Sequence, residues 1–499
     1  MIHAIILVLI ILCIFIIYEE IRKWFISKKL RNFKSPKQAP ILGAAIRFIG
    51  KTNDELIETF LNIFDEVEST PLQMWLGPML TIGISQPEDI ETVLKSEDCL
   101  NKPYLYELLK CKTSILATDK EIWKPHRRAL NSAFNVKMLQ NYVPIINDLS
   151  RQMVKKMEPF LGERGDLYRT IFIAQTELVG RTLFGSKLQI TSERLSSLFN
   201  SLKLVMNNVQ YRILRFWLRW DFVFNLTKVG REEQIPLRKL IETIDQIYEH
   251  KVKELDTLKS QGIDHLTKVA EQNATNFLER CLILEQDGII SHENVHDQMR
   301  VMIVAGIDTS STTVYATLLL LAINQKHQDL VVKELRSIFD TADCDVTQDH
   351  LGSMQYLDRV IKEALRLIPP IPFIARKTSA DIQLAKGIIP QDSMVFIHIM
   401  KLHRNPTIWG KNALEFDPDR FLPENVAKRP PFSYIPFSGG ARNCIGMKYG
   451  MISAKIVLAN ILRRYKFTTD LKFEDIRARV HIVLELTNEN PLRIDKRNF

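Results

Sequence analysis

The stretch "PFSGGARNCIGMKYGM", residues 436–451, places one of the chain's six cysteines in a glycine-rich loop ahead of a predicted helix. Gly439, Gly440 and Gly446 surround Cys444, and glycine lets a backbone turn tightly and approach a flat group closely. The free amides at a helix start favour a thiolate over a thiol. A helix is expected there because apolar residues recur at helical spacing, at 451, 454, 457, 458, 461 and 462.

Two interpretations of Cys444 are open at this point. Most lone cysteines are small buried hydrophobes with no further role. However, Arg442 lies two residues earlier, and its guanidinium can hold a carboxylate through two hydrogen bonds. A thiolate, a close backbone and an anion-binding arginine together suit one face of a haem, which favours the second interpretation.

The same stretch carries a family resemblance. Phe437, Gly440, Arg442, Cys444 and Gly446 reproduce the F-x-x-G-x-R-x-C-x-G signature, and the chain thereby resembles the cytochrome P450 superfamily. The resemblance implies that Cys444 is the metal ligand of haem b, with Arg442, Phe437 and Gly446 beside the cofactor. It also implies the superfamily's fold, mainly α with a small β-rich lobe, and a haem-dependent monooxygenase.

A second motif, "VAGIDTSSTT" at residues 304–313, lies within a helix predicted from about Glu293 to Asn324. Its glycine and short polar residues disfavour a regular helix. The segment is either a slightly kinked buried helix or a helix opened to make room for dioxygen and a water. It matches the superfamily's [AG]-G-x-[DE]-T-[TS] motif, which favours the opened helix and implies that Thr309 and Asp308 deliver protons.

Basic residues elsewhere extend the predicted cofactor site. "WKPHRR", at 123–128, puts Trp123 and Arg127 on one face of a helix that Pro125 helps to start. This is a common surface pattern, but it resembles the superfamily's W-x-x-x-R motif, which implies contact with a haem propionate. Arg376, after "PPIPFIA", is similar to another propionate-binding arginine of that superfamily.

An E-x-x-R pair occurs in "KEALRL", and "FDPDRF" follows it farther along the chain. The resemblance implies that Glu363, Arg366 and Arg420 form a buried ion network. Loss of one member would strand a buried charge, so we assign the network to folding and haem retention rather than to chemistry.

The N-terminus begins with the uncharged run "AIILVLIILCIFIIY", residues 4–18, which is shorter than the roughly 20 residues of a full membrane span. A cleaved signal peptide is the alternative, but no cation precedes the run and no small-residue cleavage site follows it. The following cations keep the rest of the chain cytosolic by the positive-inside rule. We expect a signal anchor over 1–26, a basic linker over 27–43 and a catalytic domain over 44–499.

Composition supports one large folded body. The 499 residues are 46% hydrophobic, helical patterns dominate, and β-like runs occur near 70–90, 370–400 and 465–495. The cysteines show no paired or zinc-like spacing, which fits a reducing compartment. More than half of the net charge of +9 comes from the first 37 residues, so the basic balance indicates a membrane surface and no nucleic acid.

Within the superfamily, "YRILRFWLRWDFVFNLT" (211–227) and "FLPEN" look most like the family-4 clan of microsomal enzymes. That likeness implies an endoplasmic reticulum membrane protein that oxidises a fatty acid, hormone-like lipid or xenobiotic with O₂. Its electrons would come from NADPH–cytochrome P450 reductase, with cytochrome b5 as a further partner, because the chain has no G-x-G-x-x-G nucleotide loop. Lys124, Arg128 and Lys448 are candidate docking cations.

Ala305 departs from the clan, in which a glutamate at this position can attach the haem covalently, so the haem here is expected not to be covalently bound. Two other functions remain open. A haem-thiolate isomerase or dehydratase needs no reductase, but the Asp308–Thr309 pair argues against it. A non-enzymatic haem or lipid carrier needs neither the proton relay nor the reductase.

Overall fold

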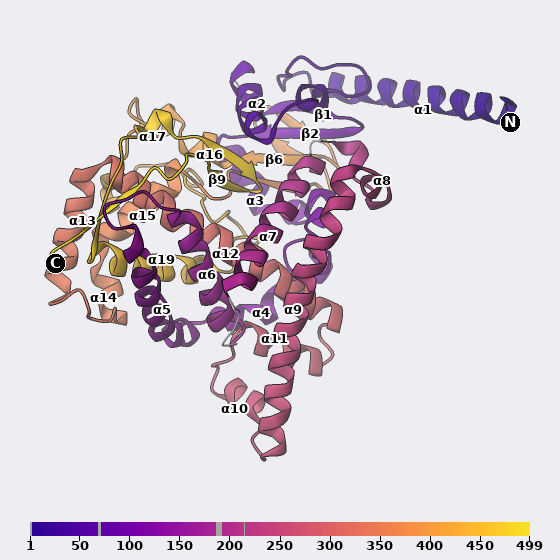
Figure 1. Ribbon diagram of the computed structural model, residues 1–499. Coiled ribbons are helices and arrows are strands. Elements are labelled where there is room, and N and C mark those ends of the chain that lie inside the picture. Colours follow the sequence, from indigo (N-terminus) through magenta and orange to yellow (C-terminus); the bar gives the residue numbers. More distant parts are fainter. Residues whose placement is uncertain (1, 68–70, 186–191, 214) are drawn as a thin grey trace.

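The protein is described by a computed structural model that covers residues 2–67, 71–185, 192–213 and 215–499. Helices form most of the body and small sheets lie along one side of it (Figure 1), so the prediction of a mainly α fold with a small β-rich part is confirmed. The helices are α1 (Ile2–Lys29), α2 (Asn53–Glu66), α3 (Pro87–Lys95), α4 (Lys120–Leu130), α5 (Val136–Met157), α6 (Leu167–Leu183), α7 (Ser192–Ile213), α8 (Asp221–Leu226), α9 (Lys228–Ser260), α10 (His265–Glu271), α11 (Phe277–Gln286), α12 (His292–Ile323), α13 (Gln325–Ile338), α14 (Gln348–Ser353), α15 (Gln355–Leu367), α16 (Ile399–His403), α17 (Pro406–Trp409), α18 (Pro423–Ala427) and α19 (Met447–Leu462).

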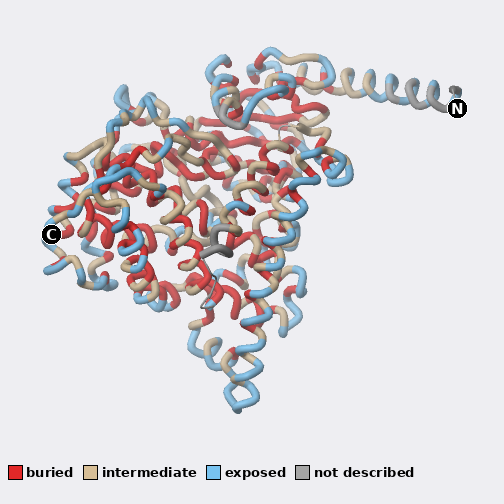
Figure 2. The backbone as a smooth tube through the Cα atoms, viewed as in Figure 1, coloured by how far each residue is buried: buried red, intermediate tan, exposed pale blue. Residues whose placement is uncertain are grey.

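Helix α12 runs through the core. It contacts α6, α11, α15 and α19, and most of its residues are buried. Gly306 lets α6 come close, because a Cβ there would lie 3.1 Å from a methyl group of Val179. Buried residues fill the centre of the body around this helix (Figure 2).

Helix α12 is continuous from His292 to Ile323 and therefore runs through its polar motif without a break. The hydroxyls of Thr309, Ser311 and Thr313 each donate to the carbonyl four residues earlier. Such back-bonding lets short polar residues lie within a continuous helix. Whether the helix widens locally at this motif stays a prediction.

The main sheet has four strands in the order β1-β2-β6-β3. β2 pairs with β6 in parallel, with Thr81 opposite Met394, and the other two pairs are antiparallel. Three two-stranded sheets complete the β structure, in the regions where β-like runs are predicted. The strands are β1 (Leu72–Leu76), β2 (Met79–Ile84), β3 (Phe373–Lys377), β4 (Ile382–Leu384), β5 (Gly387–Ile389), β6 (Met394–His398), β7 (Tyr465–Thr468), β8 (Ala478–His481), β9 (Val483–Leu486) and β10 (Arg493–Lys496).

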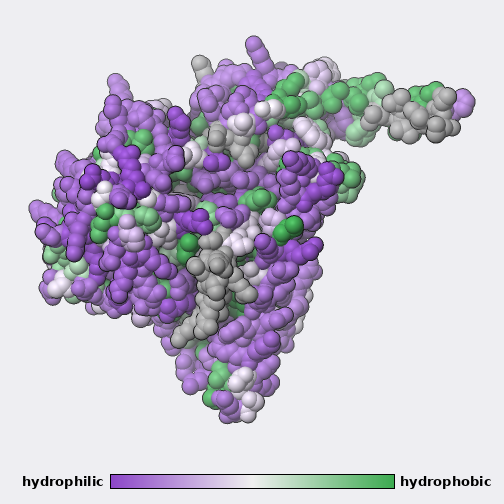
Figure 3. All heavy atoms as spheres, viewed as in Figure 1, coloured by the Kyte–Doolittle hydropathy of each residue, from purple (hydrophilic) through white to green (hydrophobic). Residues whose placement is uncertain are grey.

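Helix α1 projects from the body (Figure 1), and hydrophobic surface is visible along it (Figure 3). The segment after it packs on the main sheet. Leu30 and Phe33 are buried, and their carbonyls accept hydrogen bonds from the Gln73 amide at 3.1 and 3.3 Å. Gln38 accepts from the Trp75 amide at 2.6 Å. Residues 30–43 are therefore docked against β1.

Length and apolar composition single out one membrane-span candidate in the described part of the chain, which is α12. Within its most apolar window, 67% of the residues are buried inside the protein. Burial of that extent is typical of the core helix of a folded body.

Candidate active site

Cys444 lies in a loop whose backbone is held close to its neighbours. The Cys444 amide donates to the Phe437 carbonyl at 2.9 Å, and α19 begins at Met447 with Gly446 as its N-cap. Gly440 has φ +67°, and a Cβ there would lie 1.9 Å from the Leu94 carbonyl oxygen. Only glycine fits that position, so this part of the motif is explained by packing against α3.

The Cys444 thiol faces inward. Its residue has exposed surface, yet burial among protein atoms raises its pKa, although the Gly446 amide and Arg127 act to lower it. Exposed surface and a burial-raised pKa are compatible if the Cys444 side chain borders a space inside the protein rather than the outer surface. The Gly446 amide at the helix start lowers the pKa of the thiol, as the sequence predicts, but burial raises this pKa by more. A bound metal ion deprotonates a coordinating thiol outright.

Three cations gather beside this loop, and we call Lys102, Arg376 and Arg442 the open cluster. The Arg442 guanidinium lies 4.5 Å from the centre of the Trp123 ring and bonds the carbonyls of Ile115 and Thr118. Its Nε is buried without a hydrogen-bond partner.

Arg376 is 1% exposed and donates to the Ser438 hydroxyl at 3.1 Å. Lys102 lies over the Tyr106 ring at 4.1 Å, and burial together with the charges of Arg376 and Arg442 holds the pKa of its ammonium well below the usual value. In the described part of the chain, no carboxylate forms an ion pair with a member of the open cluster, and Asp119 acts on Arg442 only through its more distant charge. Uncompensated buried cations are costly, so this place fits a ligand that carries carboxylates.

Lys102 is the member that sequence reasoning missed. It belongs to no motif, and only the fold brings it to Arg376 and Arg442. Two of the predicted site residues, Trp123 and Arg442, do lie together as the motifs imply.

Arg127 lies beside the Cys444 loop, and its predicted contact with a haem propionate stays a prediction. It donates to the carbonyl and the side-chain oxygen of Asn443 at 2.8 and 3.0 Å, so it supports the residue next to Cys444. Pro125 does not start the helix, because α4 begins at Lys120 and contains this proline in its interior.

On α12, Asp308 is buried and its Oδ1 accepts hydrogen bonds from the Tyr168 hydroxyl at 2.6 Å and the Lys203 ammonium at 3.0 Å. Thr309 donates to the Ala305 carbonyl. Ala305 is exposed in the middle of this core helix, so it also borders interior space. Tyr168 and Lys203 come from α6 and α7, and no motif in the sequence indicates them.

The predicted ion network is confirmed, and we call Glu363, Arg366 and Arg420 the closed cluster. Arg366 binds Glu363 through two hydrogen bonds of 2.7 Å each, and both side chains are 0% exposed. Arg420 Nε lies 3.6 Å from the same carboxylate. Arg366 also donates to the carbonyls of His403, Ala413 and Glu415. Every charge in this cluster has a partner within the chain.

The described residues provide no complete set of metal ligands. Across the described ranges, no group of three or more His, Cys, Asp or Glu side chains is arranged to hold a metal ion. An iron at Cys444 would need its remaining ligands from a macrocycle, as in haem, and the open cluster suits the carboxylates of that macrocycle. The residues present therefore fit a haem.

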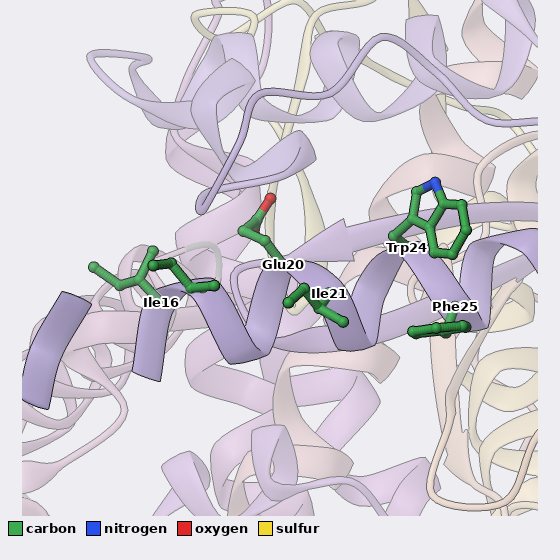
Figure 4. Close-up of a pocket in the computed structure, with 6 residues that line it drawn as sticks. Ile16, Glu20, Ile21, Trp24 and Phe25 are labelled. Atoms are coloured by element: carbon green, nitrogen blue, oxygen red, sulfur yellow. The ribbon is translucent and has the colours of Figure 1, made fainter. Parts of the chain in front are cut away.

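Two hollows lie elsewhere. One is an open apolar groove formed by a single helix, α1, with Ile16, Ile21, Trp24 and Phe25 along it and Glu20 at its edge (Figure 4). The other is a small cavity of about 10 Å³ between α6, α7 and α12, with Lys203 and Asp308 in its wall. Only the second hollow touches a predicted site residue.

Comparisons with known proteins agree with the geometry. Residues 34–490 match the family model described as Cytochrome P450. The chain is similar to "Probable cytochrome P450 313a4" of Drosophila melanogaster, at 30% identity over 98% of both chains. It is 33% identical to "Probable cytochrome P450 313a3" of the same organism, over 94% of both. "Cytochrome P450 4V2" of Rattus norvegicus is 27% identical over 96% of this chain and 91% of its own.

Proposed function

The chain belongs to the cytochrome P450 family, which makes it a haem-dependent monooxygenase. From this premise we propose which residues bind the haem, which deliver protons and which class of substrate is oxidised. Membership of this family implies haem b as cofactor, O₂ and a small molecule as substrates, and a redox partner. The arrangement that carries the proposal is Cys444 in its close-fitting loop beside the unpaired cations of the open cluster.

We propose that Cys444 binds the haem iron and that Arg376, Arg442 and Lys102 bind the haem carboxylates. Haem with a thiolate ligand supplies the oxygen chemistry of this family. Trp123 supports Arg442 through its ring, and Arg127 holds the loop at Asn443, while Phe437 and Gly446 shape its backbone.

The haem is held without a covalent bond in this proposal, because Ala305 offers no carboxylate on the face of α12 that borders interior space. Acidified organic solvent is expected to extract all of the haem and leave colourless protein. Retention of haem on the chain after extraction would contradict this expectation.

Asp308 and Thr309 are proposed to move protons to the site where oxygen is reduced. Asp308 is an ionisable group in the core helix, and the Thr309 hydroxyl can donate or accept a proton beside it. Thr309→Ala is expected to leave haem binding intact and to divert electrons from NADPH to hydrogen peroxide. Unchanged coupling would remove Thr309 from the reaction.

The proposed substrate is lipophilic: a fatty acid, a hormone-like lipid or a xenobiotic. A cluster of apolar side chains from α7 and the short 3-10 helix Tyr104–Leu109 supports this, since it packs near Val304 of α12 and Ile482 after β8. Its buried members are Leu108, Val205, Met206 and Val209. Apolar walls of this kind favour hydrophobic ligands.

We propose that residues 1–26 anchor the enzyme in the endoplasmic reticulum membrane, followed by a basic segment over 27–43 and the catalytic domain over 44–499 in the cytosol. Exposed apolar side chains along α1 support membrane contact. Attachment of glycan to Asn225 or Asn273 in the expressed protein would place the body in the lumen and contradict this topology.

NADPH–cytochrome P450 reductase is the proposed electron donor, with cytochrome b5 as a second partner. Arg128 and Lys448 are exposed, whereas Lys124 is paired with Glu97 at 2.5 Å. Arg128 and Lys448 are therefore the stronger docking cations, because no ion pair within the described residues holds their charges.

Purified enzyme, reductase and NADPH test the proposed function. A monooxygenase consumes NADPH and releases one oxygen-bearing product for each O₂ used. NADPH-independent conversion of a peroxide would indicate an isomerase or dehydratase. Haem binding with neither reaction would indicate a carrier.

A further inference from the structure

The proposed proton donor Asp308 is itself enclosed. Its side chain is 10% exposed, and its Oδ1 is bound by Tyr168 and Lys203. A buried carboxylate with two donors is held in one position, so a proton must reach it through the groups that surround it. Those groups come from two other helices, α6 and α7.

A second carboxylate lies on the far side of Lys203. Glu485 Oε1, in β9, is 3.8 Å from the Lys203 ammonium, and Glu485 Oε2 is 2.7 Å from His481 Nε2 in β8. Arg479 Nε is 3.9 Å from the same oxygen. The Glu485 side chain is 21% exposed, about twice as much as that of Asp308, so it is the more accessible carboxylate of the two.

The charges around Glu485 define its state. Burial acts to raise its pKa, but the hydrogen bond from His481 and the charges of Lys203, His481 and Arg479 hold it below the usual value. Glu485 is therefore ionised near neutral pH, so any proton that it takes up is passed on rather than kept. Tyr168 stays protonated in the same range, because burial and the Asp308 charge raise its pKa far above the usual value.

The small cavity beside these groups offers no alternative path. Its volume of about 10 Å³ is close to that of a single water. Apart from Lys203 and Asp308, the residues around it are apolar: Phe172, Leu202, Met206 and Val304. Among the lining residues of this cavity, a water would therefore find polar partners only in Lys203 and Asp308. Tyr168, the other donor to Asp308, accepts a hydrogen bond from the Lys203 ammonium at 3.1 Å, so both contacts of Asp308 lead to Lys203.

We propose that Glu485 and Lys203 form the route by which protons enter to Asp308, an inference that rests on the proposed role of Asp308. Glu485 takes a proton from solvent. The Lys203 ammonium gives one proton to Asp308 and takes the proton from Glu485, so that Lys203 ends as it began. One N–H and one O–H bond break, one of each forms, and no electrons are transferred.

The distances fit this exchange. Lys203 is already hydrogen-bonded to Asp308 at 3.0 Å, and its flexible four-carbon chain needs to shift by less than about 1 Å to reach hydrogen-bond distance from Glu485. His481 holds Glu485 in place for this contact. Lys203, Glu485 and His481 are thus positioning residues that act on the reaction through Asp308.

The first test needs neither reductase nor substrate. Lys203→Met removes the cation from buried Asp308, so Asp308 should take up a proton at neutral pH. Infrared spectra of the haem-loaded enzyme should then show a protonated carboxyl band that is absent from the double variant Lys203→Met/Asp308→Asn. Lys203→Arg should show no such band. Absence of the band in Lys203→Met would overturn the link between Lys203 and Asp308.

The second test uses NADPH oxidation with purified reductase. Glu485→Gln should slow oxidation about ten-fold or more, since general acid steps contribute at least this much, and should enlarge the solvent deuterium isotope effect. Glu485→Asp should recover part of the rate. Glu489→Gln is the matched control, because Glu489 is exposed and lies four residues away. Wild-type rate, isotope effect and pH profile in Glu485→Gln would overturn the proposal.

The two tests separate failure of this inference from failure of the proposed function. If the wild type oxidises no NADPH with the reductase, the proposed function fails, and the infrared result still decides whether Lys203 controls Asp308. If the wild type is active and Glu485→Gln equals it, only the route through Glu485 is wrong.

Discussion

The open and closed clusters each contain a fully buried arginine, Arg376 or Arg366, and they differ in what neutralises its charge. In the closed cluster, Arg366 binds Glu363 through two hydrogen bonds of 2.7 Å. In the open cluster, Arg376 is equally buried but bonds only the Ala375 carbonyl and the Ser438 hydroxyl. The cations of the closed cluster are neutralised by a carboxylate of the chain itself, whereas those of the open cluster are neutralised only when an anionic ligand binds.

This difference separates residues that hold the fold from residues that hold the cofactor. A buried cation with its own carboxylate is strongly destabilising to break, because the partner is left as an uncompensated charge. A buried cation that has no carboxylate partner already destabilises the fold before the ligand binds. Mutations in the two clusters should therefore change haem-free stability in opposite directions.

The largest effect is expected from Glu363→Gln. It leaves Arg366 and Arg420 buried without their carboxylate, so the free energy of unfolding should fall by about 3–5 kcal/mol. Denaturant titration of the haem-free protein measures this directly. Glu424→Gln is the control, because Glu424 is exposed and makes no ion pair in the described part of the chain. Equal stability of the two variants would show that the closed cluster does not hold the fold.

Arg376→Leu should act on the cofactor instead. Loss of a hydrogen bond to a charged group costs about 1.5–3 kcal/mol, so haem affinity should fall about ten- to a hundred-fold. The haem-free protein should be no less stable than the wild type, because the buried guanidinium lacks a carboxylate there. Transfer of haem to a haem-binding acceptor protein measures the affinity. Wild-type affinity would remove Arg376 from the site.

His403, whose carbonyl accepts a hydrogen bond from Arg366, makes the stability of the folded protein depend on pH. Burial and the Arg366 charge lower the pKa of His403 to about 3, and its Nε2 accepts from the Ile435 amide at 2.9 Å. Between pH 6.5, about the usual histidine pKa, and pH 3, His403 is protonated in the unfolded chain but not in the folded chain. Stability should therefore fall as pH drops from about 6.5 towards 3. His403→Gln should remove about 1.4 kcal/mol per pH unit from this slope.

The smallest effect is expected from Lys102→Met. Because the folded pKa of Lys102 is lowered, the unfolded chain binds more protons, and the haem-free wild type should gain stability as pH rises towards about 10.4. The variant should lose this gain and be more stable at neutral pH. Haem affinity should fall only a few-fold, since Lys102 is partly exposed. Lower haem-free stability of the variant would contradict the description of an open cluster.

The sequence predicts those parts of the site that local backbone geometry controls. The loop around Cys444 follows from its glycines, of which Gly440 has φ +67° and no room for a Cβ. The pair Glu363 and Arg366 lies on one helix, α15, three residues apart, so its contact is local. Residues that meet only through the tertiary fold are not visible in this way, as Lys102, Tyr168, Lys203 and Glu485 illustrate.

One local prediction failed because tertiary packing outweighs residue preferences. Pro125 suggests a helix start, but α4 begins earlier, at Lys120, after Asp119. Helix preferences are weak compared with tertiary contacts.

The central claim is that the open cluster and Cys444 hold a haem with a thiolate ligand. The most direct measurement is the absorption spectrum of the reduced, carbon-monoxide-bound protein, compared between wild type and Cys444→His. The wild type should show the red-shifted Soret band of a thiolate complex, and Cys444→His should show the band of an imidazole complex or lose the haem. A red-shifted band that persists in Cys444→His would contradict the claim.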